Sequence, residues 1–198
     1  MKTMIQEKGS RQRILGVAIR LFFEQGYLAT GINQIIEQAQ VCKASFYSNF
    51  PSKEDLCLAY IKTAHVNWMA LLGKEINKHR NAYERLMAIF TFLENWMNSC
   101  SYRGCGLMNI SSETPELKGR IRQLIQQRND ILKKSIYALV DDLGKSDPRF
   151  VRMNVQEVTS FMLMIIQGAI VSSQAQVETT PIRHAKRSFK RFLGSYIN

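Results

Sequence analysis

The chain has 198 residues, 45% of them hydrophobic, so it is long enough to bury a core and too apolar to be disordered. Its longest apolar runs fall short of about 18 residues and its first residues lack an apolar segment, so we expect no transmembrane helix, no signal peptide and a cytoplasmic location. The net charge is +11, but residues 1–60 hold only seven basic against five acidic side chains, so charge supports a nucleic-acid partner weakly.

The first predicted helix begins at Ser10, a candidate N-cap, and ends at Gly26. A second helix follows over residues 32–39, because four apolar residues recur there at helical spacing: Ile32, Ile35, Ile36 and Ala39. After a break of about three residues, a third short helix covers residues 43–50. The tight spacing of the last two helices predicts a helix-turn-helix.

The two faces of the third helix differ in chemistry. Phe46 and Phe50 share the inner face, and polar groups dominate the outer face: Lys43, Ser45, Tyr47, Ser48 and Asn49. These groups can donate to phosphate oxygens and base edges, and the face carries no carboxylate that phosphates would repel. The pattern favours a DNA-binding head over the alternative, a helical hairpin in an unrelated bundle.

The rest of the chain also predicts helices, over residues 53–79, 83–100, 106–112, 116–143, 155–174 and 181–196. Ser52 with Asp55 resembles a capping box, and Gly144 is a candidate stop for the fourth of these six helices. Residues 155–174 are apolar on several faces, which indicates burial by the helix's own domain and by a partner subunit. The last helix is basic and could lie on a membrane surface, but its apolar stripe favours packing on the body.

The polar chemistry of the chain does not suggest catalysis. The four cysteines form no CxxC pair and the three histidines lack metal-ligand spacing, so we expect free thiols, no metal and no cofactor. Cys105 has no histidine near it in sequence that could act as a base. We therefore expect a protein that is not an enzyme.

Residues 10–60 resemble the tetracycline-repressor (TetR) family of bacterial transcription regulators. The likeness is carried by Gln25-Gly26-Tyr27 and by Thr30, Ile35, Ala39, Val41, Lys43, Ser45, Phe46, Tyr47, Phe50, Lys53 and Leu56. The segment 104–113 is similar to a Gly-Cys segment in a subset of the family that includes cysteine-based electrophile sensors. The resemblance implies an all-α fold with a helix-turn-helix DNA-binding domain over residues 1–52. It further implies a helical ligand-binding and dimerisation domain over residues 53–198.

The same resemblance implies roles for individual residues on double-stranded operator DNA. Thr30, Tyr47 and Lys53 would contact phosphates; Lys43, Ala44 and Ser45 would contact base edges; Asn49 would lie near the DNA backbone. Four departures from the family pattern stand in the motif. Ala44 replaces a common glycine and Asn49 replaces a common aromatic residue or histidine. The other two lie in the turn and at the helix cap. Gln40 replaces a common turn glycine, and Cys42 replaces a serine that usually caps the third helix, each at a cost of about 1 kcal/mol.

A small-molecule site and two redox candidates complete the prediction. An apolar or aromatic inducer would contact aromatic and thioether side chains, with His65 as a polar anchor: His65, Trp68, Met69, Phe90, Trp96, Met108, Phe161 and Met164. Taken singly, each of these side chains is better explained as simple core. Cys105, near Arg103, and Cys42, at a helix start, are candidate thiolate sensors, although Cys105 could be only a small buried residue.

These expectations combine into a ligand- or redox-responsive regulator. A homodimeric repressor would leave a palindromic operator when a small apolar, aromatic or electrophilic inducer binds. The alternative is a basic protein that binds nucleic acid without sequence preference, because most of the positive charge lies beyond residue 60.

Overall fold

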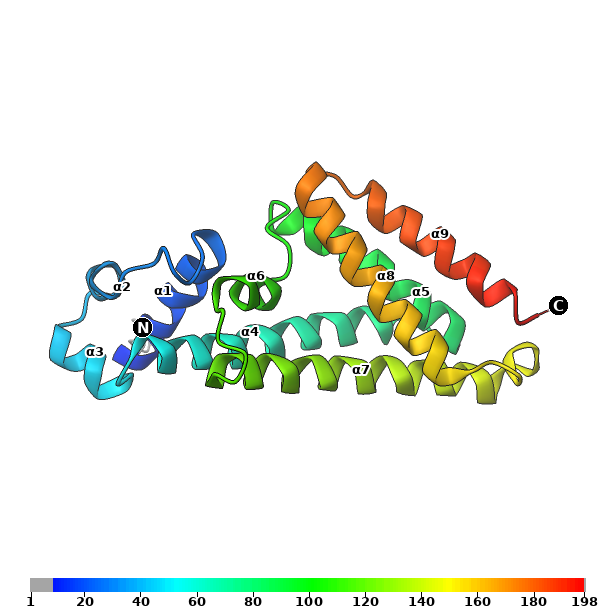
Figure 1. Cartoon of the computed structure of the whole chain (residues 1–198), viewed down its shortest axis with the longest axis horizontal. Coiled ribbons are helices and arrows are strands. Elements are labelled where there is room, and N and C mark those ends of the chain that lie inside the picture. Colours follow the sequence, from blue (N-terminus) through cyan, green and yellow to red (C-terminus); the bar gives the residue numbers. More distant parts are fainter. Residues whose placement is uncertain (1–8, 198) are drawn as a thin grey trace, which may run out of the picture. The chain divides into compact units, whose positions relative to one another are not determined.

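The computed structural model describes residues 9–197, and within that range every regular element is helical, as predicted (Figure 1). The elements are α1 (Ser10–Glu24), α2 (Ile32–Gln38), α3 (Lys43–Asn49), α4 (Lys53–Ile76), α5 (Ala82–Ser99), α6 (Gly106–Glu113), α7 (Arg120–Ser146), the 3₁₀ helix η1 (Pro148–Phe150), α8 (Val155–Gln176) and α9 (Thr180–Gly194). The predicted lack of a signal peptide rests largely on residues 1–8, which lie outside the described range.

The chain divides into two compact units. Unit 1 contains residues up to 66 together with Gly106–Ile125, and unit 2 contains Asn67–Cys105 together with residues from 126 onward. Helices α4 and α7 each contribute residues to both units. This division follows contacts in space, whereas the predicted boundary after residue 52 follows function along the chain, so that boundary stays a prediction.

Unit 1 forms around the inner faces of its first four helices. α1 packs on α2 and α3, and the buried side chains come from all of these helices: Ile14, Ala18, Leu21, Phe22, Ile35, Phe46, Phe50 and Leu56. α1 ends because Gly26 adopts φ +96°, a conformation that a side chain disfavours. The predicted N-cap was wrong by one residue, since Gly9 precedes the helix and Ser10 is its first residue.

The start of α4 follows the predicted capping box. The Ser52 hydroxyl accepts a hydrogen bond from the backbone N–H of Asp55 at 3.0 Å and donates one to the Asp55 carboxylate at 2.7 Å. Ser52 thereby satisfies one of the N–H groups that every helix leaves unpaired in its first turn.

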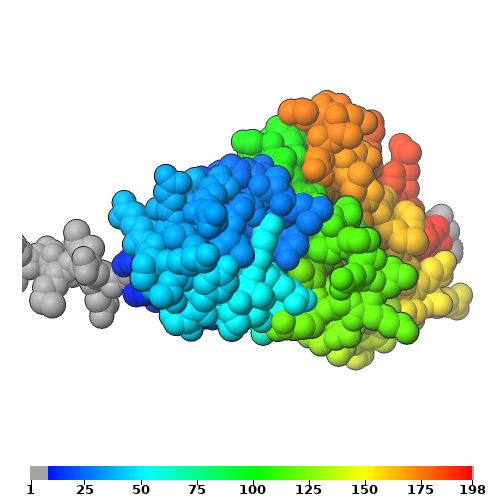
Figure 2. Space-filling model, turned by 60° about the vertical axis from the view of Figure 1, so that its left-hand side comes forward, coloured from blue at the N-terminus to red at the C-terminus, as the bar shows by residue number. Residues whose placement is uncertain are grey.

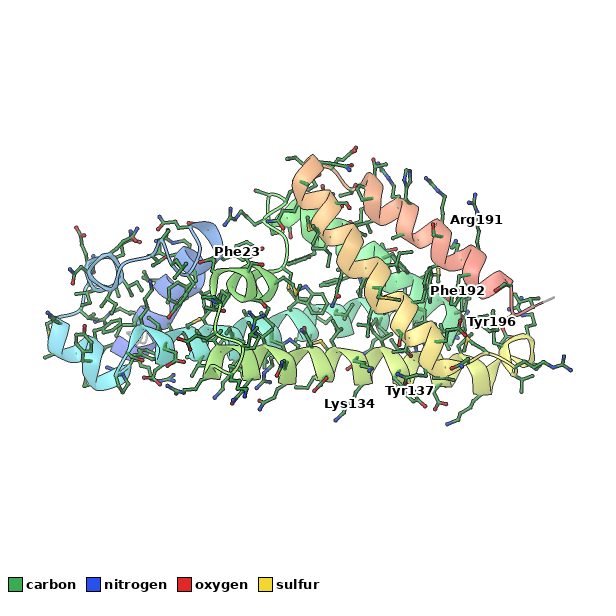
Figure 3. All side chains as sticks on the ribbon, in the orientation of Figure 1. Phe23, Lys134, Tyr137, Arg191, Phe192 and Tyr196 are labelled. Atoms are coloured by element: carbon green, nitrogen blue, oxygen red, sulfur yellow. The ribbon has the colours of Figure 1, made fainter. Side chains whose placement is uncertain are left out.

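Unit 2 contains a layer of α5, α8 and α9, which contact one another in all three pairs (Figure 1). The basic last helix, α9, packs against α5 and α8, which is the alternative that the sequence favoured over a membrane-surface helix. Ile182 and Phe189 on α9 are fully buried in the core. Phe192 and Tyr196 also turn inward, whereas Arg191 projects from the outer side of α9 (Figure 3).

The predicted limits of α7 needed correction at both ends. The helix starts at Arg120 rather than residue 116, because a turn with the Glu116 carboxylate against Gly119 precedes it. Gly144 does not stop the helix, which continues to Ser146. A Cβ at this glycine would lie 3.6 Å from the Phe150 carbonyl oxygen, which is an ordinary contact, so nothing in the packing requires glycine there.

One helix among the described residues, α8, is long and apolar enough to cross a membrane by length and composition alone, contrary to the expectation from contiguous runs. A buried helix of a soluble protein passes the same test. Part of α8 is buried, since Val158, Met162 and Ile166 join the core of unit 2. Its composition is therefore accounted for in part by packing within the protein.

Candidate DNA-binding surface

The short helix α3 owes its position to packing. It has seven residues, too few for a stable helix in isolation, and Phe46 and Phe50 fix its inner side with ring centroids 6.5 Å apart. Both rings are buried, as predicted. The outer side is therefore held at the surface of unit 1 by contacts made beneath it.

The outer side of α3 presents a cation, a small apolar side chain, a phenol and a hydroxyl. Lys43, Ala44 and Ser48 are exposed and the Tyr47 side chain is 40% exposed. Figure 2 shows unit 1 from a side where the blue-to-cyan segments that include α2, α3 and the start of α4 lie at the surface. No carboxylate belongs to α3 itself, so the helix offers donors without a like charge to repel phosphates.

Two of the polar side chains on α3 form hydrogen bonds within their own helix. The Ser48 hydroxyl and the Asn49 amide both donate to the Ser45 carbonyl oxygen, at 3.0 and 2.8 Å. These bonds hold both side chains in defined orientations. Asn49 and Ser45 are half-buried.

The turn between α2 and α3 contains a residue in the left-handed conformation, which glycine adopts most easily. Gln40 adopts φ +52°, so a residue with a side chain occupies the left-handed region at a cost of roughly 1 kcal/mol. The Arg13 guanidinium donates to the carbonyl oxygens of Ala39 at 3.1 Å and Gln40 at 3.4 Å. These bonds tie α1 to the turn and offset its strain.

Sequence reasoning missed the role of the α1 arginines. Arg20 donates to the Gln38 side chain on α2, and Arg11 lies over the Phe50 ring at 5.0 Å from its centroid. The signal was available, because Arg13 and Arg20 are seven residues apart and so share one face of α1. That face points at α2 and the turn.

Cys42 occupies the N-cap of α3, as predicted, and its side chain makes no capping hydrogen bond. The thiol is exposed. The helix therefore begins without the side-chain acceptor that serine or threonine supplies.

Two residues predicted to contact phosphates have other partners. Thr30 is fully buried and its hydroxyl donates to the Gly26 carbonyl at 2.7 Å, so its phosphate contact stays a prediction that the free protein does not display. The Lys53 ammonium lies 4.7 Å from the centre of the Tyr27 ring and donates to the Leu28 carbonyl at 3.3 Å. Burial lowers the pKa of Lys53, although nearby acidic groups oppose the change.

The surroundings of Lys53 are partly apolar. Burial raises the pKa of Tyr27 to about 12, and burial also raises the pKa of Cys57 to about 12. A thiol with so high a pKa is almost entirely protonated at neutral pH, so Cys57 is an inert core residue.

The remaining cysteines differ in their surroundings. Burial raises the pKa of Cys100, whose Sγ donates to the Met97 carbonyl oxygen at 3.6 Å. Cys105 is half-buried between Gly104, which has φ +72°, and Gly106. Of the two candidate sensors, Cys42 is thus the more exposed and Cys105 the more enclosed.

The eight predicted ligand-binding side chains do not all belong to one unit. His65 and Met108 lie in unit 1, and the other six lie in unit 2: Trp68, Met69, Phe90, Trp96, Phe161 and Met164. The Trp68 ring meets the rings of Phe92 and Trp96 edge to face, with centroids 5.3 and 6.1 Å apart.

The other members of that set have different environments. Phe90 is core, 1% exposed, against Phe189, and Phe161 contacts Phe192 with centroids 4.3 Å apart. Met164 is 64% exposed, so most of its side chain lies outside the core of its unit. The aromatic cluster around Trp68 is the part of the predicted site that the fold brings together.

Comparisons with known proteins cover most of the chain. Residues 14–60 match the model of bacterial regulatory proteins of the tetR family, and residues 82–189 match the tetracyclin repressor-like C-terminal domain. The biofilm operon negative transcriptional regulator IcaR of Staphylococcus aureus is 24% identical over 191 residues, 95% of this chain and 97% of that protein. An uncharacterized HTH-type transcriptional regulator of Lactococcus lactis is 25% identical over 169 residues, 83% of each chain.

Solved structures agree on the fold. A TetR-family transcriptional regulator from Streptomyces coelicolor superposes with a TM-score of 0.84 at 22% identity, covering 96% of this chain and 90% of that one. The reduced form of NemR from E. coli superposes with a TM-score of 0.73 at 19% identity, covering 92% and 96%.

Proposed function

The chain belongs to the TetR family of bacterial transcription regulators, and on this premise we propose that it is a homodimeric repressor released from a palindromic operator by a small apolar, aromatic or electrophilic molecule. The single observation that carries the DNA-binding part is the outer side of α3, which is exposed, polar and free of carboxylates. The family consists of regulators rather than enzymes.

We assign the operator contacts to the residues that α3 leaves accessible. Lys43 and Tyr47 have exposed groups that can donate to phosphate oxygens or base edges, and Ala44 offers apolar contact to a thymine methyl group. Ser45 is assigned to base edges, and Asn49 is placed near the DNA backbone. Thr30 and Lys53 support the head from within, because both have internal partners.

Dimerisation is proposed through α8 and α9. Met164 and Val171 lie seven residues apart on α8, so they share one face, and both are more than half exposed in the single chain. An open groove beside that face is lined by small and apolar groups of both helices, among them Ile165, Gly168, Ser172 and Pro181. A twofold pairing there would cover apolar surface and place two heads for half-sites about 34–36 Å apart.

The inducer is proposed to enter unit 2 near the Trp68 cluster. Edge-to-face aromatic rings suit a flat apolar molecule, and Met69 adds adaptable thioether surface. An electrophile would instead modify Cys105 or Cys42. The likeness to reduced NemR concerns the fold alone, so this part of the proposal rests on the two thiols.

Repression rather than activation is proposed from the relatives. IcaR is described as a negative transcriptional regulator and covers nearly the whole chain at 24% identity. Induction then requires that the ligand binds the state with low DNA affinity more tightly than the DNA-binding state.

Footprinting of the pure protein on its own upstream DNA tests the proposal. We expect a protected palindrome, and we expect Lys43→Ala to weaken binding and to reduce the slope of log affinity against log salt by about 0.9, the value for one phosphate contact. Lys134→Ala removes an exposed cation of α7 (Figure 3) and should change neither quantity. Affinity that varies little with DNA sequence would instead support the nonspecific nucleic-acid protein.

A thiol-reactive electrophile added to the same footprint tests the redox part. Protection should disappear in the wild type and persist in the variant that lacks the responsible thiol, Cys105→Ser or Cys42→Ser. Protection that survives treatment of the wild type would remove the electrophile from the proposal and leave the repressor intact.

A further inference from the structure

Helix α6, which follows Cys105, makes close contacts with other helices of unit 1. A Cβ added to Gly106 would overlap the Tyr60 hydroxyl and lie 3.3 Å from the Phe23 ring. Glycine therefore lets the start of α6 approach both α1 and α4 closely, and Phe23 lies beside α6 in Figure 3.

The last residue of α6, Glu113, contacts the turn between α1 and α2. The Glu113 carboxylate accepts a hydrogen bond from the backbone N–H of Leu28 at 2.7 Å, across 85 residues of sequence. A Cβ added to Gly26 would lie 2.8 Å from the other oxygen of this carboxylate. The glycine that ends α1 thus also makes room for Glu113.

The carbonyl oxygen of Leu28 in the same turn is hydrogen-bonded as well. The Lys53 ammonium donates to the Leu28 carbonyl at 3.3 Å and covers the Tyr27 ring. Both backbone polar groups of Leu28 are therefore bound by charged side chains from other helices. Leu28 itself is 64% exposed, so apolar packing of its side chain contributes little to fixing the turn.

Hydrogen bonds from Arg122 also fix the end of α6 that carries Glu113. The Arg122 guanidinium donates to the carbonyl oxygens of Ser111 at 2.9 Å and Thr114 at 2.8 Å. Arg120 forms ion pairs with Glu54 and Asp55 at the start of α4, at 3.2 and 2.8 Å. The backbone around Glu113 is therefore held in place by other side chains, so its carboxylate is less free to move than an isolated surface carboxylate.

We propose that Glu113 is a positioning residue for operator binding, which ties α6 to the turn between α1 and α2 and so holds the helix-turn-helix in its DNA-binding geometry. The tie rests on the proposed function, because its purpose is operator affinity. It gives the Gly104–Glu113 segment a task that needs no reactive cysteine.

Three variants test the tie on the full-length protein. Glu113→Ala removes the acceptor, Glu113→Gln keeps an oxygen that can accept from Leu28, and Glu116→Ala removes an equal charge from an exposed neighbouring position. We expect Glu113→Ala to bind the footprinted operator about tenfold more weakly, and the other two to stay within about twofold of wild type. Wild-type affinity in Glu113→Ala, or equal weakness in Glu113→Gln, would overturn the proposal.

Hydrogen exchange tests the same tie without DNA. The Leu28 amide should exchange faster in Glu113→Ala than in wild type, while Glu113→Gln and Glu116→Ala keep it protected. Unchanged exchange in Glu113→Ala would overturn the tie even if operator affinity fell. If the wild type protects no operator, the proposed function fails, and the exchange result still decides whether Glu113 holds the turn.

Discussion

The turns of the DNA-binding head and the helix layer of unit 2 are stabilised by different kinds of contact. In the head, single charged side chains hold backbone groups: Arg13 holds the turn before α3, and Glu113 holds the turn after α1. In unit 2, α5, α8 and α9 share a broad apolar core in which Phe90 and Phe189 are two members of many. We infer that single polar substitutions will change DNA binding in the head, whereas unit 2 will respond mainly to lost packing.

The largest test truncates one buried ring in each region. Phe46→Ala and Phe90→Ala should each destabilise the unit that contains them by about 3–5 kcal/mol, the usual cost of removing a buried phenylalanine. Both tryptophans lie in unit 2, so tryptophan fluorescence reports that unit and far-UV circular dichroism reports both. For Phe46→Ala we expect circular dichroism to change at lower denaturant than fluorescence. Coincident transitions would contradict independent stabilisation.

The next test places a charge on the exposed face of α8. Val171→Asp should raise the dimer dissociation constant roughly 100-fold or more, because a twofold interface contains the buried carboxylate twice. Analytical ultracentrifugation measures the change. Val151→Asp is the matched control, since Val151 is 73% exposed in the same unit but outside α8 and α9. Equal dimerisation in both variants would exclude α8 as the interface.

Arg13→Met tests whether one side chain can control the head. Its loss removes charged hydrogen bonds to two carbonyl oxygens and should cost about 2 kcal/mol of head stability. Operator affinity should fall with it, while the tryptophan fluorescence transition of unit 2 stays in place. A shift of both transitions together would show that the two regions do not respond separately.

Ser52→Ala tests the polar contacts at the start of α4, with an expected cost of about 1 kcal/mol at neutral pH. Hydrogen bonds from Ser52 and Arg120 hold the pKa of Asp55 below its ordinary value. A carboxylate with a lowered pKa in the folded state stabilises the fold above its ordinary pKa and loses that effect as pH falls through the folded value. The difference between variant and wild type in thermal unfolding should therefore shrink below about pH 4. A difference that is constant down to pH 2 would contradict this account.

The smallest expected effect is a gain. Gln40→Gly removes the left-handed strain before α3 and should stabilise the head by up to about 1 kcal/mol, less the added backbone freedom of glycine in the unfolded chain. In the Arg13→Met background the gain should be larger if the arginine compensates for the strain. A double-mutant cycle on head stability measures this coupling. Strict additivity would show that the Arg13 hydrogen bonds do not compensate for the strain at Gln40.

Local patterns made most of the head predictable. The spacing of Phe46 and Phe50 indicated the buried side of α3. The left-handed turn at Gln40 and the missing cap at Cys42 were expected from the resemblance to the TetR family, which usually has glycine and serine at these positions. Helix limits were less predictable: α7 continues through Gly144 to Ser146, because a glycine is permitted inside a helix and does not by itself end one.

Contacts between distant segments were not predictable from a single sequence. The bonds from Arg13 to Ala39 and from Leu28 to Glu113 join residues 26 and 85 apart, and no periodicity connects them. Burial of Thr30 was not predicted either, although its partner is near in sequence: its hydroxyl donates to the Gly26 carbonyl four residues back, within a turn to which no helical or strand periodicity applies. The ligand set stays a prediction, with the Trp68 cluster as its best-supported part.

The apolar face of α8 also bears on how sharply the regulator would respond to its own abundance. If Met164 and Val171 are covered only in the dimer, chains below the dimer dissociation constant are mostly single, and the dimer concentration grows as the square of the chain concentration. Operator occupancy would then rise more steeply than in proportion to expression. A modest change in synthesis or degradation of the chain would move the controlled promoter between its silent and active states.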